Sequence, residues 1–207
     1  MTTTAPATPI VVRKAHAVDR ASVSAALAAA FHDDPVFAWI HPELDGRAAK
    51  VRFFFDLAVE ALAHHEDIWS AGPGTSGAAL WVPYGRPPMT DEQGEAFGAA
   101  LGERAGQDAG RLFELMALME EQHPHEPHAY LWFLGVVPWA QGRGIGSALM
   151  APVLDRVDRL GVPVYLEATS ARGKALYERH GFVASGPFAA AAGPPLWPMW
   201  REPRISN

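Results

Sequence analysis

The chain contains no cysteine among its 207 residues, and this absence excludes several kinds of chemistry at once. Disulfide bonds, thiolate metal ligands and a cysteine nucleophile are all ruled out. No apolar run approaches the roughly 20 residues of a membrane-spanning helix, and Met1–Pro9 lacks the basic start and apolar centre of a signal peptide. We therefore expect a soluble, cytoplasmic protein that has no membrane partner.

Charge is also scarce, and its balance is acidic. Charged residues make up 19% of the chain and hydrophobic residues 49%, which is typical of a globular protein and not of a disordered one. A net charge of -6 argues against the basic face that a nucleic-acid partner needs and mildly favours a cationic or neutral one. The length fits one domain, and we predict a disordered tail over residues 1–9 and a single domain over 10–203.

The first half of the chain predicts helices grouped around a hairpin. Apolar residues recur at helical spacing in several stretches, and a Gly/Pro-rich turn separates two short apolar runs. The predicted elements are a strand at Ile10–Arg13, a helix capped by Asp19 and running to Phe31, helices over Val36–Ile40 and Gly46–His64, a hairpin of Ile68–Ser70 with Ala78–Val82, and a helical, rather polar stretch from Thr90 to about Gln122.

The second half predicts a strand–helix–strand unit. Tyr130–Val137 is a nearly continuous apolar run, as in a strand covered on both faces. A glycine-rich turn follows, and then a helix with an apolar stripe that Gly161 closes. The remaining predicted elements are a strand at Val162–Ala168, a short helix at Lys174–His180, and closing strands at Phe182–Val183 and Pro195–Trp200. This order favours an α/β or α+β domain.

The glycine-rich turn, Gln141–Ser147, has the chemistry of an anion site. Glycines allow a tight turn and a close ligand approach, and the first amides of the following helix are free and carry the positive end of its dipole. Together they suit a pyrophosphate, and Arg143 adds a positive charge. The segment lacks the Gly-Lys-Ser/Thr ending of a nucleotide P-loop, and its glycines at 142, 144 and 146 do not follow the dinucleotide pattern.

The turn does match the Q/R-x-x-G-x-G/A signature of the GNAT acetyltransferase superfamily. Val136-Val137-Pro138 precedes it, and Leu166-Glu167-Ala168 and Ala175–Phe182 resemble later family segments in order and spacing. The resemblance implies a single GNAT-like α/β (α+β) domain. Its mixed, twisted central sheet would carry helices on both faces and split between two adjacent strands.

The resemblance also implies a cofactor site for acetyl-CoA, which serves as co-substrate. The backbone of the strand end, at Val136, Val137 and Pro138, would pair with the pantetheine arm. The pyrophosphate would lie on the turn, whose members are Gln141, Gly142, Arg143, Gly144, Ile145, Gly146 and Ser147. Many relatives have a cofactor-binding asparagine after the next strand; Thr169–Lys174 lacks it, which leaves Ser170 or Arg172 as substitutes.

Two proton transfers are needed when an amine attacks a thioester. By resemblance, Tyr177 is the acid that protonates the departing thiolate, and a phenol with a pKa near ~10 stays protonated at neutral pH. Glu167 is the candidate base, directly or through water, and His128 is a second candidate. Backbone amides near Val136 could stabilise the oxyanion.

A histidine-rich segment, His123-Pro124-His125-Glu126-Pro127-His128, raises the question of a metal site. Its prolines enforce an extended chain and no other ligand cluster accompanies it, so we predict a loop and no metal. The predicted function is acetyl-CoA-dependent N-acetylation of a small amine by a monomer or homodimer, and antibiotic-like molecules are among the candidate acceptors. A protein or peptide amine as acceptor, and a non-catalytic acyl-CoA sensor, stay open as alternatives; residues 46–122 would form the acceptor pocket.

Overall fold

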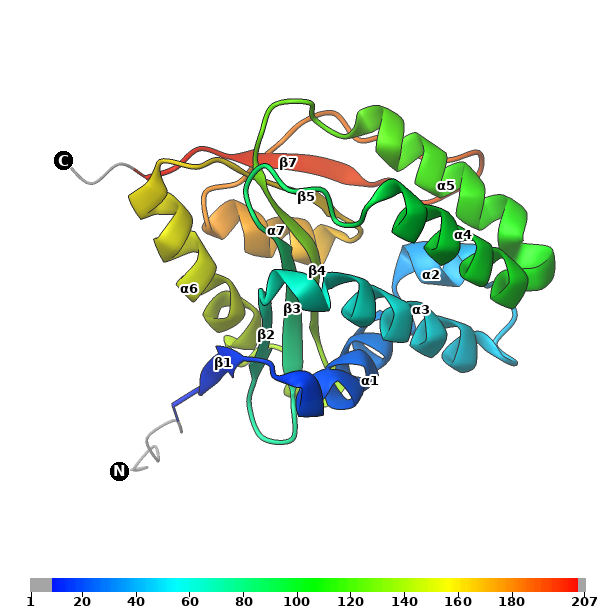
Figure 1. Cartoon of the computed structure of the whole chain (residues 1–207), viewed down its shortest axis with the longest axis horizontal. Coiled ribbons are helices and arrows are strands. Elements are labelled where there is room, and N and C mark those ends of the chain that lie inside the picture. The colour runs from blue at the N-terminus through cyan, green and yellow to red at the C-terminus, as the bar shows by residue number, and fades with distance from the viewer. Residues whose placement is uncertain (1–8, 205–207) are drawn as a thin grey trace, which may run out of the picture.

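A seven-stranded mixed sheet forms the centre of the computed structural model, which describes residues 9–204 (Figure 1). The strand order is β1-β2-β3-β4-β5-β7-β6, and every neighbouring pair is antiparallel except β4 with β5. The strands are β1 (Val12–Lys14), β2 (Ile68–Ala71), β3 (Gly77–Val82), β4 (Ala129–Val136), β5 (Val164–Ala168), β6 (Val183–Ala184) and β7 (Trp197–Arg201). Residues 1–8 of the predicted tail lie outside the described residues.

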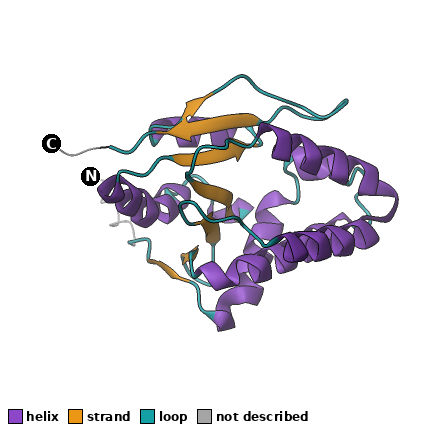
Figure 2. Ribbon diagram, turned by 45° about the horizontal axis from the view of Figure 1, so that its top comes forward, coloured by secondary structure: helices purple, strands orange, loops and turns teal. Residues whose placement is uncertain are grey.

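Helices cover both faces of this sheet (Figure 2). They are α1 (Arg20–Phe31), α2 (Pro35–Ile40), α3 (Arg47–Leu62), α4 (Asp91–Ala105), α5 (Ala109–Gln122), α6 (Ile145–Leu160) and α7 (Ala171–Arg179). The predicted fold class, an α/β domain with a mixed central sheet and helices on both faces, is confirmed. No helix within residues 9–204 is both long and apolar enough to cross a membrane.

Strand β3 shows how the two faces are separated. All of its residues are buried, and because side chains alternate along a strand, they divide between two cores. Ala78, Leu80 and Val82 belong to the core that α1 to α5 cover, whereas Ala79 and Trp81 belong to the core beneath α6 and α7. The unbroken apolar pattern of β3 therefore follows from its position between two helical layers.

The helical stretch predicted from Thr90 to about Gln122 is helical in the structure, where it divides into two helices. The chain breaks at Gly106, whose φ of 60° and ψ of -121° suit only glycine. A short 3-10 turn, Gly106–Asp108, then leads into α5. The break lets α5 fold back beside α4, and the two helices pack against each other as a hairpin (Figure 1).

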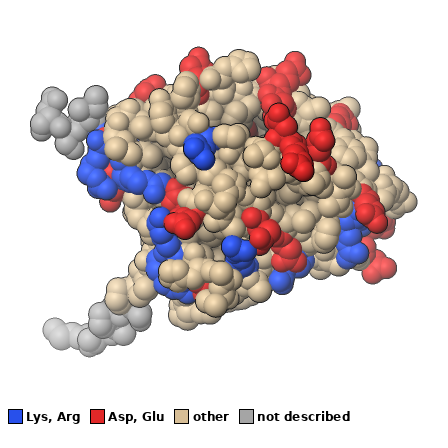
Figure 3. Space-filling model, in the orientation of Figure 1, with Lys and Arg blue, Asp and Glu red and all other residues tan. Residues whose placement is uncertain are grey.

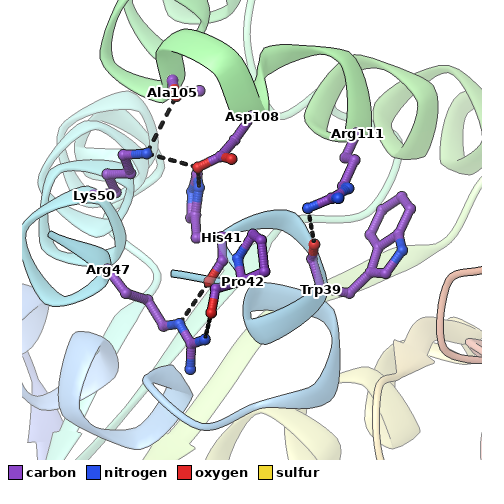
Figure 4. A network of polar contacts seen from close by, with 8 residues as sticks. All are labelled: Trp39, His41, Pro42, Arg47, Lys50, Ala105, Asp108 and Arg111. Carbon is purple, nitrogen blue, oxygen red and sulfur yellow. Dashed lines mark hydrogen bonds and ion pairs between the residues drawn. The ribbon is translucent and has the colours of Figure 1, made fainter. Parts of the chain in front are cut away.

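A buried polar network holds this helical hairpin to α2 and α3 (Figure 4). One carboxylate oxygen of Asp108 accepts a hydrogen bond from Lys50 Nζ (2.6 Å). The same oxygen lies 2.9 Å from His41 Nδ1. Burial alone would raise the pKa of Asp108, but these two partners hold it below its ordinary value. Arg111 of α5 donates to the carbonyl oxygen of Trp39 (3.2 Å), so α2 and α5 are joined at a second point.

Two further boundaries differ from the sequence prediction. Asp19 does not cap α1 with its side chain; its carboxylate accepts from the His16 amide (2.8 Å) and from Arg13, which closes a 3-10 turn ahead of the helix. Helix α7 starts at Ala171, before the predicted Lys174, because Ser170 Oγ accepts the Gly173 amide (3.1 Å) as an N-cap. The predicted hairpin of β2 and β3 is confirmed, with bounds shifted by one residue.

Candidate active site

The central sheet splits between β4 and β5. Their parallel pairing consists of Ala129 with Val164 and Tyr130 with Tyr165, after which the strands separate. On its other side β4 stays paired to β3 as far as its C-terminal end, with one bulge at Trp132. The backbone of β4 beyond the split therefore faces a gap on one side, and an extended, amide-containing ligand can pair with such a strand edge.

A cavity of about 920 Å³ occupies this gap. One end is bounded by the glycine-rich turn and the start of α6, and the other by α4, α5 and the histidine-rich loop. Tyr177 and Glu167, the two predicted catalytic residues, both line it. The split in the sheet thus brings the predicted cofactor turn and the predicted acid and base to one continuous space.

The glycine-rich turn has the geometry that its sequence predicts. Gly142 and Gly144 have φ values of 78° and 83°, and Gly144 is the N-cap residue of α6. A side chain at Gly142 would meet open space, so its backbone is accessible to a ligand. The first turn of α6 begins at Ile145 beside the cavity, where its free amides and helix dipole favour an anion.

The side chain of Gln141 connects the turn to its surroundings. Its Nε2 donates to the Val136 carbonyl oxygen (3.0 Å), and its Oε1 accepts from Arg172 of α7 (2.5 Å). Arg172 is thereby held beside the glycine-rich turn, and Ser170 lines the same cavity while it caps α7. Both predicted substitutes for the family asparagine are therefore close to the turn, and Arg172 is the one that brings positive charge.

Three predicted cofactor-binding residues lie away from the cavity lining. Val137 donates its amide to the Ser76 carbonyl oxygen (3.0 Å), so that amide is already engaged. Pro138 begins a 3-10 turn, and Arg143 is exposed to solvent. Among the predicted strand-end positions, Val136 is the one that lines the cavity. Ser147 lines it too, with its hydroxyl 2.9 Å from His180 Nε2.

Tyr177 lies on α7 with only 8% of its surface exposed. Burial, and to a lesser extent the negative charge of Asp34, raise the pKa of its phenol above the ordinary value. The hydroxyl therefore stays protonated throughout the neutral range. This is the state that a proton donor to a departing thiolate requires.

Asp34 is a cavity residue that the sequence analysis missed. The sequence showed it only as the residue before Pro35, where a helix was expected to end. In the structure it caps α2 by accepting the Val36 amide (2.9 Å), and its second carboxylate oxygen accepts from Thr169 Oγ1 (2.5 Å). Burial raises its pKa, and it lies in the same cavity as Tyr177, so it is a third candidate base.

Glu167 is held at the point where β4 and β5 diverge. Only 3% of its side chain is exposed, and its Oε2 accepts a hydrogen bond from Tyr130 OH (2.7 Å). Burial, together with the negative charge of Glu167, raises the pKa of Tyr130, which therefore stays a hydrogen-bond donor. Within residues 9–204, Oε1 of Glu167 has no hydrogen-bond partner, which leaves that oxygen available to accept a proton.

The histidine-rich segment forms a loop, as predicted, and it closes one end of the cavity. His123 and His128 come together, with their Nε2 atoms 3.2 Å apart, and His123 Nδ1 lies 3.8 Å from Glu167 Oε1. His128, the second predicted base candidate, contacts His123, which lies beside Glu167. In the described part of the chain, no group of three or more side chains is arranged to hold a metal ion.

The far wall of the cavity is mostly apolar and comes from the helical hairpin. Its α4 and α5 members are Phe97, Leu112, Leu115, Met116, Met119 and Glu120. Two methionines give this wall side chains that can adapt to different ligand shapes. Acidic side chains gather on the outer surface over this part of the molecule (Figure 3), which favours the approach of a cation.

Comparison with known proteins identifies the family. Residues 79–182 match the sequence model of the Acetyltransferase (GNAT) family, and this segment makes up half of the chain. It contains most of β3, all of β4, the glycine-rich turn, Glu167 and Tyr177. The chain therefore belongs to the GNAT acetyltransferase family, and the family resemblance seen in the sequence is confirmed.

Individual relatives cover different shares of the chain. Mycothiol acetyltransferase from Beutenbergia cavernae is 42% identical over 71 residues, which is 33% of this chain and 24% of that protein. The chain thus spans about a quarter or less of the length of the curated relatives it matches. One solved structure from Corynebacterium glutamicum, described as histone acetyltransferase HPA2 and related acetyltransferase, is similar over almost the whole chain. Its TM-score is 0.69 and its sequence identity is 27%, and the match covers 97% of this chain and 99% of that one.

A more distant structure extends the fold comparison to an animal enzyme. The polyamine N-acetyltransferase of Drosophila melanogaster, which forms N-acetylagmatine, has a TM-score of 0.64 and 20% identity. The match covers 94% of this chain and all of that one. At this identity the likeness shows the fold alone.

Proposed function

We propose that this protein transfers the acetyl group of acetyl-CoA to a primary amine of a small molecule by direct attack of the amine on the thioester. The observation that carries the proposal is the single cavity that joins the anion site of α6, Tyr177, Glu167 and an apolar wall. Family membership supplies the reaction class. The cavity supplies a continuous path between the two substrates.

The residues at one end of the cavity fit the pyrophosphate and pantetheine of a coenzyme A. The amides at the start of α6 and the guanidinium of Arg172 would hold the pyrophosphate. The unpaired edge of β4, from the bulge to Val136, would hydrogen-bond to the amides of the pantetheine arm. The thioester would then lie where the two strands separate, beside Tyr177.

The protein then contributes two proton transfers and one electrostatic contact. Glu167 Oε1 accepts the proton of the incoming ammonium while Tyr130 keeps the carboxylate oriented. A backbone amide of β4 stabilises the oxyanion of the tetrahedral intermediate. Tyr177, whose phenol is protonated at neutral pH, gives its proton to the departing thiolate.

The acceptor is proposed to be a small amine with an apolar body. The α4–α5 wall presents aromatic, leucine and methionine side chains and encloses the end of the cavity where the amine would lie. A cavity closed by a helical hairpin fits a small molecule better than a folded protein. The sequence also resembles puromycin N-acetyltransferase in its Glu126-Pro127 and Gly161-Val162-Pro163 segments, so antibiotic-like aminonucleosides belong among the candidates.

The test is thiol release from acetyl-CoA, measured with a panel of amines and compared with a Tyr177→Phe variant. The panel contains aryl- and alkylamines, agmatine, spermidine, puromycin and peptides with free amino groups. We expect turnover with an apolar-bodied amine and a loss of about 10- to 100-fold in kcat for the variant. Turnover with peptides alone would instead assign a protein acceptor. If acetyl-CoA raises the melting temperature but no amine releases thiol, the chain is a sensor and the enzyme proposal is wrong.

A further inference from the structure

The hydrogen bonds of the histidine-rich loop determine which nitrogen atoms carry protons. His128 Nδ1 lies 2.7 Å from the Glu126 carbonyl oxygen, and a carbonyl can only accept. His128 Nδ1 therefore carries a proton, and its Nε2 is an acceptor when the ring is neutral. Since that Nε2 is 3.2 Å from His123 Nε2, the His123 nitrogen must be the donor. In neutral His123 the lone pair is then on Nδ1.

That lone pair faces the buried carboxylate of the site. His123 Nδ1 is 3.8 Å from Glu167 Oε1, the oxygen that has no hydrogen-bond partner within residues 9–204. An approach of about 1 Å would bring the two atoms to hydrogen-bond distance. Glu167 has 3% of its side chain exposed and His123 has 31%, so His123 stands between the buried carboxylate and water.

The other titratable groups around His123 do not compete for a proton. The rings of Tyr130 and Tyr165 pack edge-on against it, with centroid distances of 4.9 and 5.1 Å. Burial raises the pKa of both phenols, and the negative charge of Glu167 raises it further. Burial also lowers the pKa of His128, which keeps that ring neutral and able to accept from His123.

We propose that His123 receives the proton of the amine from Glu167 and releases it to water, and that His128 holds His123 in the tautomer this transfer needs. The proposal rests on the proposed function with Glu167 as base. An ammonium N–H bond breaks as an O–H bond forms at Glu167 Oε1. The same proton then moves to His123 Nδ1, which restores the carboxylate. The cationic ring, stabilised by Glu167 and by His128 Nε2, returns the proton to solvent. Both histidines act through Glu167, so they are positioning residues.

The experiment measures kcat against pH for the full chain with acetyl-CoA and the best acceptor of the amine panel. For His123→Gln we expect a loss of about tenfold at pH 7 that shrinks toward pH 9–10, where more of the amine arrives already deprotonated. Added imidazole should restore part of the loss, and KM for acetyl-CoA should not change. His128→Gln keeps an acceptor oxygen for His123 and should retain most activity, whereas His128→Leu should resemble His123→Gln. His64→Gln, on the outer surface, is the control.

The possible outcomes distinguish a failure of the proton transfer from Glu167 to His123 (the relay) from a failure of the proposed function. If the wild-type chain acetylates an amine but His123→Gln keeps its rate and pH profile, the relay is wrong and the function stands. A loss that is equal at every pH and unaffected by imidazole would show a structural role and also overturn the relay. If the wild-type chain acetylates no amine, the proposed function itself fails. Melting temperatures and coenzyme A binding of each variant show whether its fold is retained.

Discussion

The two ends of the cavity are built by regions with very different sequence signals. The half proposed to bind the cofactor (the cofactor half), made of β4, α6, β5 and α7, carries the glycine-rich turn, Glu167 and Tyr177 in one stretch of the chain. The half proposed to bind the acceptor (the acceptor half), made of α2, α3, α4 and α5, carries apolar side chains at helical spacing and no motif. Binding a pyrophosphate through backbone amides requires glycines at a helix start, so a site of this kind has a recognisable sequence. An apolar wall, in contrast, can be made by many combinations of side chains.

The largest predicted effect separates amine activation from cofactor binding. Glu167→Gln preserves the size of the side chain and an acceptor for Tyr130, but it removes the proton acceptor. We expect kcat to fall about 10²–10⁴-fold while coenzyme A still binds with unchanged affinity, as measured by thiol release and titration calorimetry. Asp34→Asn is the companion variant, since it also removes a buried carboxylate of the cavity. A large loss for Asp34→Asn together with a small one for Glu167→Gln would assign the base to Asp34.

The next effect is on the stability of the acceptor half. Asp108→Ala leaves Lys50 and His41 without their shared buried partner, and removing one member of such a group costs about 3 kcal/mol or more. We expect the free energy of unfolding to fall by about that amount in urea denaturation. Asp155→Ala removes an exposed carboxylate from α6 and should change it by less than about 0.5 kcal/mol. Equal effects of the two substitutions would show that the network of Figure 4 contributes little.

A third prediction concerns the cofactor half and uses two glycines of the same helix. Gly144 and Gly161 flank α6, and both have positive φ values, 83° and 66°. A valine at either position costs about 1–2 kcal/mol of backbone strain. Only Gly144→Val should also weaken coenzyme A binding, by about tenfold or more, because its backbone borders the anion site. A similar loss of affinity in Gly161→Val would mean that the strain, and not the local geometry, disturbs binding.

The smallest predicted effect is an acid dependence of stability. Asp158 on α6 accepts two hydrogen bonds of 2.7 Å from the buried Arg201 on β7, and this pairing holds its pKa below the ordinary value. The unfolded chain therefore binds the proton more readily, so the stabilisation is complete above about pH 4 and is lost as the pH falls through the folded-state pKa. Asp158→Asn should be less stable at pH 7 and should change less between about pH 4 and 2 in urea denaturation. Asp155→Asn should follow the wild-type curve.

Much of the cofactor half could be predicted from sequence because its signals are local. The glycine-rich turn, the strand before it and the helix after it depend on neighbouring residues. The strand was predicted within one residue of its observed bounds, and the helix ends before Gly161 as predicted. The division of the helical stretch from Thr90 to Gln122 into two helices was not predicted, because the break depends on distant partners. Gly106 permits the break, but Lys50 and His41, more than 50 residues earlier, hold Asp108 in place.

The fold class, the family and the glycine-rich turn at the start of α6 could be predicted from sequence alone, since apolar periodicity and a helix-start motif act over short stretches of chain. Tertiary structure decided which groups share the cavity. Asp34 joins it through Thr169, which is 135 residues away, and His123 lies opposite Glu167 because the split between β4 and β5 leaves that carboxylate reachable from the loop. Contacts of this range depend on how the layers pack, and no local pattern in the chain specifies them.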